Sequence, residues 1–441
     1  MTASPHLEAR MKLRRTLLTL LAAALAAVTA NTTGAAAVPV PIQVNAAAPE
    51  PVPGALQRHD ITGTYVSGLS SGGFMANQLH VAHSAAFDGA GIFSAGPYRC
   101  AQGNLGHALN ACMKTTLPGK TPAELAAETR NLASAGRVDP VSGLAGDPVY
   151  LYHGTADDTV LQAVNDDLAA YYGALGADVV YDRTSGAGHA WVSPAGTNAC
   201  SSTASPYVNR CGGADPVGDM LRHLLGGVTA PGTGPLAGRL VSFDQDPYVP
   251  GGDPAAVSMG REGFVYVPPV CESGPCRLMV TLHGCYQYHG LVGDALIDKA
   301  YLNEYADANR MIVLYPQATT APDNPRGCWN WWAYGGDTAY AERAGKQITA
   351  LMGMVRALGG AEPGPTPTPT ASPSPNPTST PTPTSAPVCV TAGNYAHVAA
   401  GRARQRQGYA YAAGSGQNLG LWNVYVTSTI KEIAPGHWVR C

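Results

Sequence analysis

Charged side chains are scarce in this chain of 441 residues: Asp, Glu, Lys and Arg make up 13% of it, and the formal net charge is −3. A typical soluble domain contains about 25% of these residues. With so little charge of either sign, the chain lacks the strong field that recruits nucleic acid or an anionic membrane, and we expect neither as a partner. A surface poor in charge suits an uncharged substrate, although biased genome composition explains it equally well.

Long apolar segments are missing beyond the N-terminus. Residues 16–27 are apolar but too short to span a bilayer with ease. They follow a basic stretch, residues 10–15, and precede the small residues Val28-Thr29-Ala30. This order is typical of a secretory signal peptide, which we assign to residues 1–30; a membrane anchor is the alternative. We therefore expect a secreted, extracellular protein that is free of the membrane once the signal is removed.

The cysteine spacing typical of zinc sites is also missing, because no close pair of cysteines is accompanied by a second pair of ligands. We therefore expect no metal. The ten cysteines are an even number, which fits an oxidising compartment. Three pairs are close in sequence, two cysteines remain in the large central region, and two bracket the last segment. We predict the disulfides Cys100–Cys112, Cys200–Cys211, Cys271–Cys276, Cys285–Cys328 and Cys389–Cys441, although sequence alone does not prove this connectivity.

Proline marks the boundaries between the predicted parts of the chain. Residues 362–388 alternate Pro with Thr and Ser, a composition that cannot form a core and favours an extended linker. The linker separates a large domain, residues 58–361, from a small C-terminal module, residues 389–441. A Pro- and Ala-rich stretch before the large domain leads us to assign residues 31–57 to a disordered lead.

The large domain has short apolar runs that are separated by helical stretches. The runs at 149–152, 179–181, 278–282 and 311–315 predict buried strands, and 122–135 and 164–175 predict helices. Buried strands that alternate with helices favour an α/β fold with a largely parallel sheet and helices on both faces. In such folds ligands bind at the carboxyl ends of the strands.

Residues 68–72 fit the pattern Gly-x-Ser-x-Gly with Ser70 at its centre. The β-forming residues 61–67 precede it, and the helix-forming residues 74–83 follow it. This is the order of a nucleophile elbow, in which a sharp strand-to-helix turn exposes a serine. We predict that Ser70 is a catalytic nucleophile.

A serine nucleophile needs a histidine base and a carboxylate that orients it, and both follow a predicted strand here. Asp157 lies in the turn after the strand at 149–152, with Asp158 as the competing choice. His189 lies in the glycine-rich loop after the strand at 179–181, and the alternative is an ordinary loop histidine. We expect His153 to pack at a strand end.

Attack by a serine on a carbonyl group also needs two hydrogen-bond donors for the oxyanion of the tetrahedral intermediate. The first donor is the backbone N–H of Ser71. The second normally comes from a His-Gly loop ahead of the serine, but here such a loop occurs downstream, at Thr-Leu-His-Gly-Cys-Tyr-Gln (281–287). A circular permutation would move this strand behind the catalytic residues and keep the site intact. We then expect the Cys285 N–H to be the second donor; an unrelated turn is the alternative.

Three motifs in this order resemble extracellular poly(3-hydroxybutyrate) depolymerases with a circularly permuted catalytic domain. They are Gly-Leu-Ser-Ser-Gly-Gly-Phe-Met-Ala (68–76), Leu-His-Gly-Cys (282–285) and Cys-Trp-Asn-Trp-Trp (328–332). The resemblance implies a permuted α/β-hydrolase fold and hydrolysis of short-chain polyester through an acyl-enzyme, and we expect a monomer without a cofactor. An esterase that removes feruloyl or acetyl groups from plant cell-wall polysaccharide is the alternative. A non-catalytic polymer-binding protein is a more distant one.

The resemblance also implies that Trp329, Trp331 and Trp332 line the polymer groove. Alternation along a strand would expose Trp329 and Trp331 on one face, and core packing is the competing interpretation. The C-terminal module is rich in aromatic residues and resembles modules that attach secreted depolymerases to insoluble polymer. Its aromatic residues could instead form its core, and its basic residues could serve an anionic surface.

Overall fold

A computed structural model describes residues 47–360, 389–406, 408–423, 425–434 and 437–441. These residues fall into two compact units, a catalytic unit within 47–360 and a C-terminal module within 389–441. The predicted signal peptide and linker lie outside the described residues.

Nine strands of the catalytic unit form one sheet in the order β1-β9-β10-β12-β11-β2-β3-β4-β5. β10 is antiparallel to both of its neighbours, and every other neighbouring pair is parallel. The largely parallel α/β fold predicted from the sequence is therefore confirmed. The strands are β1 Val52–Gly54, β2 Ile61–Leu69, β3 Ala90–Phe93, β4 Pro148–Tyr152, β5 Asp178–Asp182, β9 Arg239–Asp244, β10 Glu262–Val267, β11 Cys276–Leu282 and β12 Met311–Tyr315.

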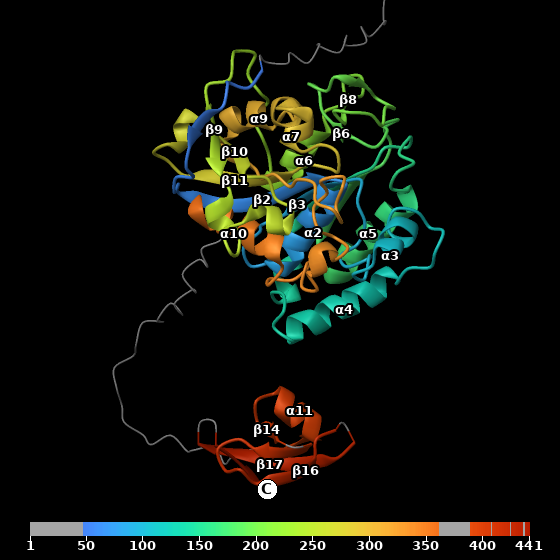
Figure 1. Cartoon of the computed structure of the whole chain (residues 1–441), viewed down its shortest axis with the longest axis vertical. Helices are drawn as coiled ribbons and strands as arrows, with labels where there is room; N and C mark the ends of the chain where they lie inside the picture. The colour runs from blue at the N-terminus through green and yellow to red at the C-terminus, as the bar shows by residue number, and fades with distance from the viewer. Residues whose placement is uncertain (1–46, 361–388, 407, 424, 435–436) are drawn as a thin grey trace, which may run out of the picture. The chain divides into compact units, whose positions relative to one another are not determined.

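Helices cover both faces of this sheet (Figure 1). On one side are α2 Ser71–Ala82, α4 Pro122–Ser134, α5 Gln162–Leu175 and α10 Lys346–Ala357, and on the other are α6 Pro216–Leu225, α7 His289–Val292, α8 Ala295–Lys299 and α9 Leu302–Asn309. Adjacent strand residues enter different cores, as Ile92 and Phe93 do, because side chains alternate along a strand. Among the described residues, no helix combines the length and apolar character needed to cross a bilayer.

Two smaller features extend the catalytic unit beyond the sheet and its helices. The helix α3 Leu105–Ala111 follows β3, and the three short strands β6 Trp191–Val192, β7 Asn198–Ala199 and β8 Val208–Arg210 follow β5 as a separate sheet. Both features therefore come after carboxyl ends of the parallel strands.

Chain order and spatial order disagree at the centre of the sheet. β11 comes late in the sequence, yet it pairs directly with β2, and Leu282 lies opposite Gly68. The loop after β11 therefore meets the turn after β2. This is the juxtaposition that a circular permutation predicts.

The first described segment does not fit the predicted disordered lead. β1 pairs in parallel with β9, and the Ala48 N–H donates to Asp298 Oδ1 at 2.8 Å. Proline is tolerated in an edge strand, where its missing N–H need not serve a second neighbour, so Pro53 does not prevent this pairing. The assignment of residues 31–57 to a disordered lead is therefore wrong for 52–54.

The C-terminal module contains two three-stranded antiparallel sheets, β13-β17-β18 and β14-β15-β16, with one short helix. Its buried apolar core consists mostly of small residues, Ala403, Ala410, Ala412, Leu419 and Ile430. So small a core needs a covalent link, and Cys389–Cys441 supplies it. The elements are β13 Cys389–Gly393, α11 Asn394–Ala399, β14 Ala403–Arg406, β15 Tyr409–Ala412, β16 Asn418–Leu421, β17 Thr427–Ala434 and β18 His437–Arg440.

All five predicted disulfides are confirmed, and no cysteine is free. Structural disulfides form and persist in oxidising environments. The cysteine pattern therefore indicates that the chain folds in such a compartment.

Glu304 on α9 is a buried carboxylic acid whose Oε2 has no hydrogen-bond partner in the described part of the chain. Burial raises the pKa of Glu304 from 4.5 to about 7. The folded state therefore holds this proton more tightly than the unfolded state does. The resulting stability is fully present below about pH 4.5 and is lost as the pH rises through about 7.

We predict that Glu304→Gln, which is neutral at every pH, gains stability over the wild type as the pH rises from 5 to 8. The difference at pH 8 should be on the order of 3 kcal/mol, because one pKa unit corresponds to about 1.4 kcal/mol. Urea unfolding of both proteins across this range measures it. A difference that stays constant with pH would contradict the prediction, whatever its size.

Candidate active site

Ser70 lies in the sharp turn between β2 and α2, with φ 55° and ψ −119°. Residues other than glycine rarely adopt such angles. Its N–H donates to the Phe93 carbonyl at 2.9 Å, and its side chain makes no capping bond to α2. The turn therefore holds the backbone of Ser70 and leaves its hydroxyl available.

The two flanking glycines of the motif are required by close backbone contacts. A Cβ on Gly68 would lie 2.3 Å from the Gly72 carbonyl oxygen, and a Cβ on Gly72 would lie 2.2 Å from the Leu282 carbonyl oxygen. Both distances are far below van der Waals contact. Only glycine therefore allows α2 to approach the end of β11 in this way.

Asp157 and His189 lie in the loops after β4 and β5, and the structure brings them together. The His189 Nδ1–H donates to Asp157 Oδ2 at 2.7 Å. Asp157 Oδ1 accepts the backbone N–H groups of Thr159 at 2.8 Å and Val160 at 3.1 Å. Asp158 is exposed, so Asp157 is the carboxylate that orients the imidazole.

Burial would raise the pKa of Asp157, but its hydrogen bonds outweigh burial and hold the pKa below the usual value. The bond from His189 contributes most, followed by bonds from the Ser94 hydroxyl and the Val160 amide. Ser94 follows β3 directly, and sequence reasoning missed it. The signal available was weak, since β3 has only four residues and begins with Ala and Gly.

Both loops are fixed by further contacts. His153 lies immediately after β4, as expected, and its Nε2 lies 2.9 Å from the Val160 carbonyl oxygen, across the turn that carries Asp157. The His189 N–H donates to Thr203 Oγ1 at 2.9 Å, and the Cys200–Cys211 disulfide closes the segment that holds Thr203. The position of the imidazole is therefore set by its backbone as well as by Asp157.

His283 holds the loop after β11. Its Nδ1–H donates to the Gly284 carbonyl at 2.7 Å, and its Nε2 accepts the Ala318 N–H at 3.0 Å. Complete burial lowers the pKa of His283 to about 4, so the ring stays neutral and this tautomer is fixed. The backbone amides of Ser71 and Cys285 have no acceptor in the described part of the chain.

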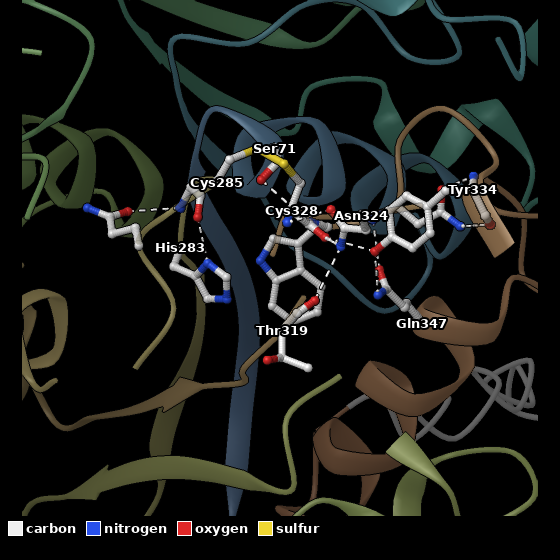
Figure 2. Close-up of a disulfide and its surroundings, with 12 residues drawn as sticks. Ser71, His283, Cys285, Thr319, Asn324, Cys328, Tyr334 and Gln347 are labelled. Carbon is white, nitrogen blue, oxygen red and sulfur yellow. Dashed lines mark hydrogen bonds between the residues drawn. A yellow bond between two sulfur atoms is a disulfide. The ribbon is translucent and has the colours of Figure 1, made fainter. Parts of the chain in front are cut away.

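The Cys285–Cys328 disulfide joins this loop to the segment that begins with Cys328 (Figure 2). The Trp329 N–H donates to Ser71 Oγ at 3.3 Å. Asn324 accepts the Cys328 N–H at 3.0 Å and donates to the Cys328 carbonyl at 2.8 Å. The Tyr334 hydroxyl donates to the same carbonyl at 2.8 Å, so the segment is held from several sides.

The tryptophans of this segment do not alternate as a strand would, because residues 329–332 form an irregular turn. Trp329 is completely buried and does not line the pocket, so its predicted exposure and substrate contact are not supported. Trp331 stacks on Phe74 with ring centroids 3.9 Å apart. Trp331 and the half-buried Trp332 both line the pocket beside Ser70.

The pocket has a volume of about 250 Å³ and lies against Ser70 and Cys285. Its charged lining residues, Asp323 and Arg326, are exposed. Its apolar lining consists of Phe74, Leu105, Leu109, Met113, Val160, Trp331 and Trp332. The described residues include no group of three or more His, Cys, Asp or Glu side chains that could hold a metal ion.

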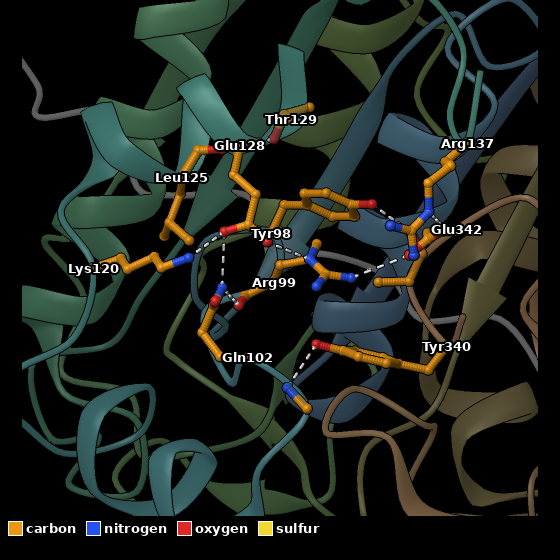
Figure 3. A network of polar contacts seen from close by, with 12 residues as sticks. Tyr98, Arg99, Gln102, Lys120, Leu125, Glu128, Thr129, Arg137, Tyr340 and Glu342 are labelled. Atoms are coloured by element: carbon orange, nitrogen blue, oxygen red, sulfur yellow. Dashed lines mark hydrogen bonds and ion pairs between the residues drawn. The ribbon is translucent and has the colours of Figure 1, made fainter. Parts of the chain in front are cut away.

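The α3 side of the pocket is braced by a polar network (Figure 3). Arg99 contacts Glu128 at 2.7 Å and Glu342 at 3.3 Å, and the Tyr340 hydroxyl accepts the Gly103 N–H at 3.3 Å. The Cys100–Cys112 disulfide brackets α3 itself. The helix that contributes Leu105 and Leu109 is therefore fixed at both ends.

No family model matches the chain. A poly(3-hydroxybutyrate) depolymerase of Delftia acidovorans is 40% identical over 304 residues, which are 67% of this chain and 59% of that protein. A polyhydroxybutyrate depolymerase of Talaromyces funiculosus is 37% identical over 316 residues, 66% of this chain and 88% of that protein. The chain belongs to the poly(3-hydroxybutyrate) depolymerase family.

Solved structures of this depolymerase family have the same fold. The crystal structure of PHB depolymerase from Penicillium funiculosum matches with a TM-score of 0.61 and 33% identity, over 69% of this chain and 98% of that one. A serine-to-alanine variant of PHB depolymerase in complex with an R3HB trimer matches with a TM-score of 0.62 at the same identity and coverage. The predicted family, fold class and enzyme class, a carboxylic ester hydrolase, are thereby confirmed.

We predict that Ser94→Gly lowers kcat for a soluble ester about tenfold with little change in KM, because a hydrogen bond to a carboxylate contributes about 1.5 kcal/mol. Ser94 has a φ of 49°, which glycine adopts without strain, so the change removes the hydroxymethyl group without straining the backbone. Steady-state kinetics measure it. Ser94→Asn, which tolerates this φ and can donate, should recover part of the loss, and a wild-type kcat in Ser94→Gly would contradict the prediction.

Proposed function

We propose that this depolymerase family member is a secreted serine esterase that hydrolyses poly(3-hydroxybutyrate) and related short-chain polyhydroxyalkanoates. The observation that carries the proposal is that three elements follow the carboxyl ends of parallel strands in one sheet, β2, β4, β5 and β11. They are the strained Ser70 turn, the Asp157–His189 pair at 2.7 Å, and the Cys285 loop beside an apolar pocket. Family membership supports the polyester as substrate.

In the proposed acylation step, Ser70 Oγ attacks the ester carbonyl carbon while His189 Nε2 takes its proton. His189 Nε2 is the nitrogen available for this role, because Nδ1 donates to Asp157. Asp157 keeps its negative charge and stabilises the imidazolium that forms. The amides of Ser71 and Cys285 would donate to the oxyanion, and the leaving alkoxide takes the proton from His189.

In the proposed deacylation step, water replaces the alkoxide. His189 accepts a proton from the water, whose oxygen attacks the acyl carbon on Ser70, and the second tetrahedral intermediate uses the same two amides. Collapse of that intermediate returns the proton to Ser70 Oγ. Each cycle leaves one chain end with a carboxylate and one with a hydroxyl group.

The pocket lining supports a short aliphatic ester as the substrate. Phe74, Trp331 and Leu109 present carbon surface, and the charged side chains stay at exposed lining positions. A sugar ester would bring hydroxyl groups into this surface, where unpaired polar groups are costly. The proposal therefore ranks polyester above cell-wall esters.

The location and assembly of the protein are part of this proposal. A signal peptide in residues 1–30, export and action outside the cell fit the five disulfides. We propose a monomer that meets an insoluble substrate. The C-terminal module would bind the solid polymer, and the Pro/Thr/Ser-rich segment 362–388 would tether it and so raise the local concentration of the catalytic unit.

We predict that Ser70→Ala lowers kcat on a soluble 3-hydroxybutyrate oligomer by about 10⁶-fold and Asp157→Asn by about 10⁴-fold, the losses typical of a serine triad without its nucleophile or its carboxylate. Titration of the released acid measures the rate. The matched control is Asp158→Asn, at the adjacent exposed position, which should keep wild-type activity. An active Ser70→Ala variant, or an inactive Asp158→Asn variant, would refute the assignment.

We also predict that deletion of residues 362–441 leaves oligomer hydrolysis unchanged but slows attack on solid polymer. The reason is that the catalytic unit contains every proposed catalytic residue, whereas adsorption would depend on the module. Turbidity loss of a polymer suspension, compared with oligomer hydrolysis, measures both. Equal rates on the suspension with and without the module would contradict its proposed role.

A further inference from the structure

Arg326 contributes a positive charge to the lining of the pocket beside Ser70. Its side chain is exposed, and none of the ion pairs among the described residues includes it. Most of the other lining residues are apolar, and Asp323 is the other charged one. A guanidinium that has no carboxylate partner in the wall of such a pocket is available to an anionic ligand.

Two contacts tie Arg326 to the loop that carries the Cys285 amide. Its guanidinium lies over the Tyr286 ring, 5.6 Å from the ring centroid, and its backbone carbonyl accepts the Tyr286 N–H at 2.8 Å. Tyr286 directly follows Cys285, whose disulfide to Cys328 joins the same two segments. The positive charge is therefore held in a set position relative to the proposed oxyanion donor.

The turn that carries Arg326 is held from inside by Asn324 (Figure 2). This side chain is completely buried, accepts the Cys328 N–H at 3.0 Å and donates to the carbonyls of Cys328 at 2.8 Å and Thr319 at 3.3 Å. The backbone N–H and carbonyl of Asn324 both bond to Ala321. The backbone below Arg326 is therefore ordered before a ligand arrives, which lowers the entropy cost of binding.

The negative charge of Asp323 belongs to a different side of the pocket. Asp323 Oδ2 accepts the Gly335 N–H at 2.6 Å, and Asp323 also lines a second cavity, which Tyr334 and Gly335 border. Arg326 lies instead against Tyr286. One oxygen of the carboxylate is thus used within the protein, and an anion that enters the pocket meets an unpaired cation on the Tyr286 side.

The proposed substrate has one anionic group per chain, the carboxylate at its end. In poly(3-hydroxybutyrate) every unit is esterified through its hydroxyl group to the carbonyl of the unit before it. When Ser70 takes the acyl part, the carboxylate end therefore always leaves with the alcohol part. The guanidinium of an arginine matches a carboxylate by donating two parallel hydrogen bonds to it.

We propose that Arg326 binds the terminal carboxylate on the leaving-group side of the bond that is cleaved, an inference that rests on the proposed function. Arg326 then determines specificity, because it favours soluble oligomers and chain ends with a free acid over the interior of a chain. The alkoxide takes its proton from His189, as in the proposed acylation step. The hydroxy acid that forms leaves from the Arg326 side of the pocket, while the acyl group stays on Ser70.

The test compares a 3-hydroxybutyrate trimer that has a free carboxylate with the same trimer capped as a primary amide, which is uncharged. In the wild type, kcat/KM for the acid should exceed that for the amide about fivefold, since an exposed ion pair contributes modestly. Arg326→Gln should bring this ratio close to one, and Arg326→Lys, which keeps the charge but not the planar fork, should keep part of it. Screening by about 0.5 M NaCl should lower the wild-type ratio.

Two further variants check the sign and the position of the charge. Arg261→Gln is the matched control, because Arg261 is also exposed but pairs with Asp246 and is not among the residues that line the pocket, so it should keep the wild-type ratio. Asp323→Asn should raise the ratio, because it removes a charge that repels the carboxylate. Both trimers are measured on one preparation, so a partly unfolded variant does not alter the ratio.

Any of three results would overturn the proposal: a wild-type ratio of one or below, an unchanged ratio in Arg326→Gln, or an equal fall of the ratio in Arg261→Gln. Cleavage of the amide trimer, followed by chromatography of its products, tests the proposed function separately. A wild type that cleaves neither trimer refutes the proposed esterase. A wild type that cleaves both trimers with the same kcat/KM refutes the role of Arg326 alone.

Discussion

The catalytic unit depends on one close backbone approach, between α2 at Gly72 and the end of β11. A Cβ at this position would lie 2.2 Å from the Leu282 oxygen and 2.5 Å from the His283 oxygen. The approach brings the Cys285 loop to the turn that carries Ser70 and Ser71. The Cys285–Cys328 disulfide then extends the same constraint to the segment that carries Trp331. The proposed nucleophile Ser70, the proposed oxyanion donors and the pocket wall are therefore all positioned by this one contact.

Sequence reasoning succeeded where a local signal was strong. The apolar runs at 149–152 and 311–315 became β4 and β12 because four or five consecutive apolar residues suit a strand buried on both faces. It failed where the stabilising contacts are distant. β1 exists because β9 offers an edge, and β3, with weak β-formers at its start, exists because β2 and β4 enclose it. Ser94 was missed together with β3.

The candidate site shows the same division between local and distant information. The sequence placed a carboxylate after β4 and favoured Asp157 over Asp158, but it showed no contact that separates the two. That choice follows from the turn, because Asp157 Oδ1 caps two backbone amides and leaves Oδ2 to His189. The alternation argument for the tryptophans assumed a strand. Asn324 and Tyr334 instead hold the two ends of the irregular turn at 329–332, through hydrogen bonds that hydrophobic periodicity in the sequence does not reveal.

The rigid walls of the pocket suit one task of the proposed function. The pocket is small and is fixed on both sides, by Cys285–Cys328 and by Cys100–Cys112 with the Arg99 network, so under the proposed function it would accept a short stretch of polymer that has left the solid. Such a pocket cannot also provide adsorption, since a crystalline surface does not enter a cavity.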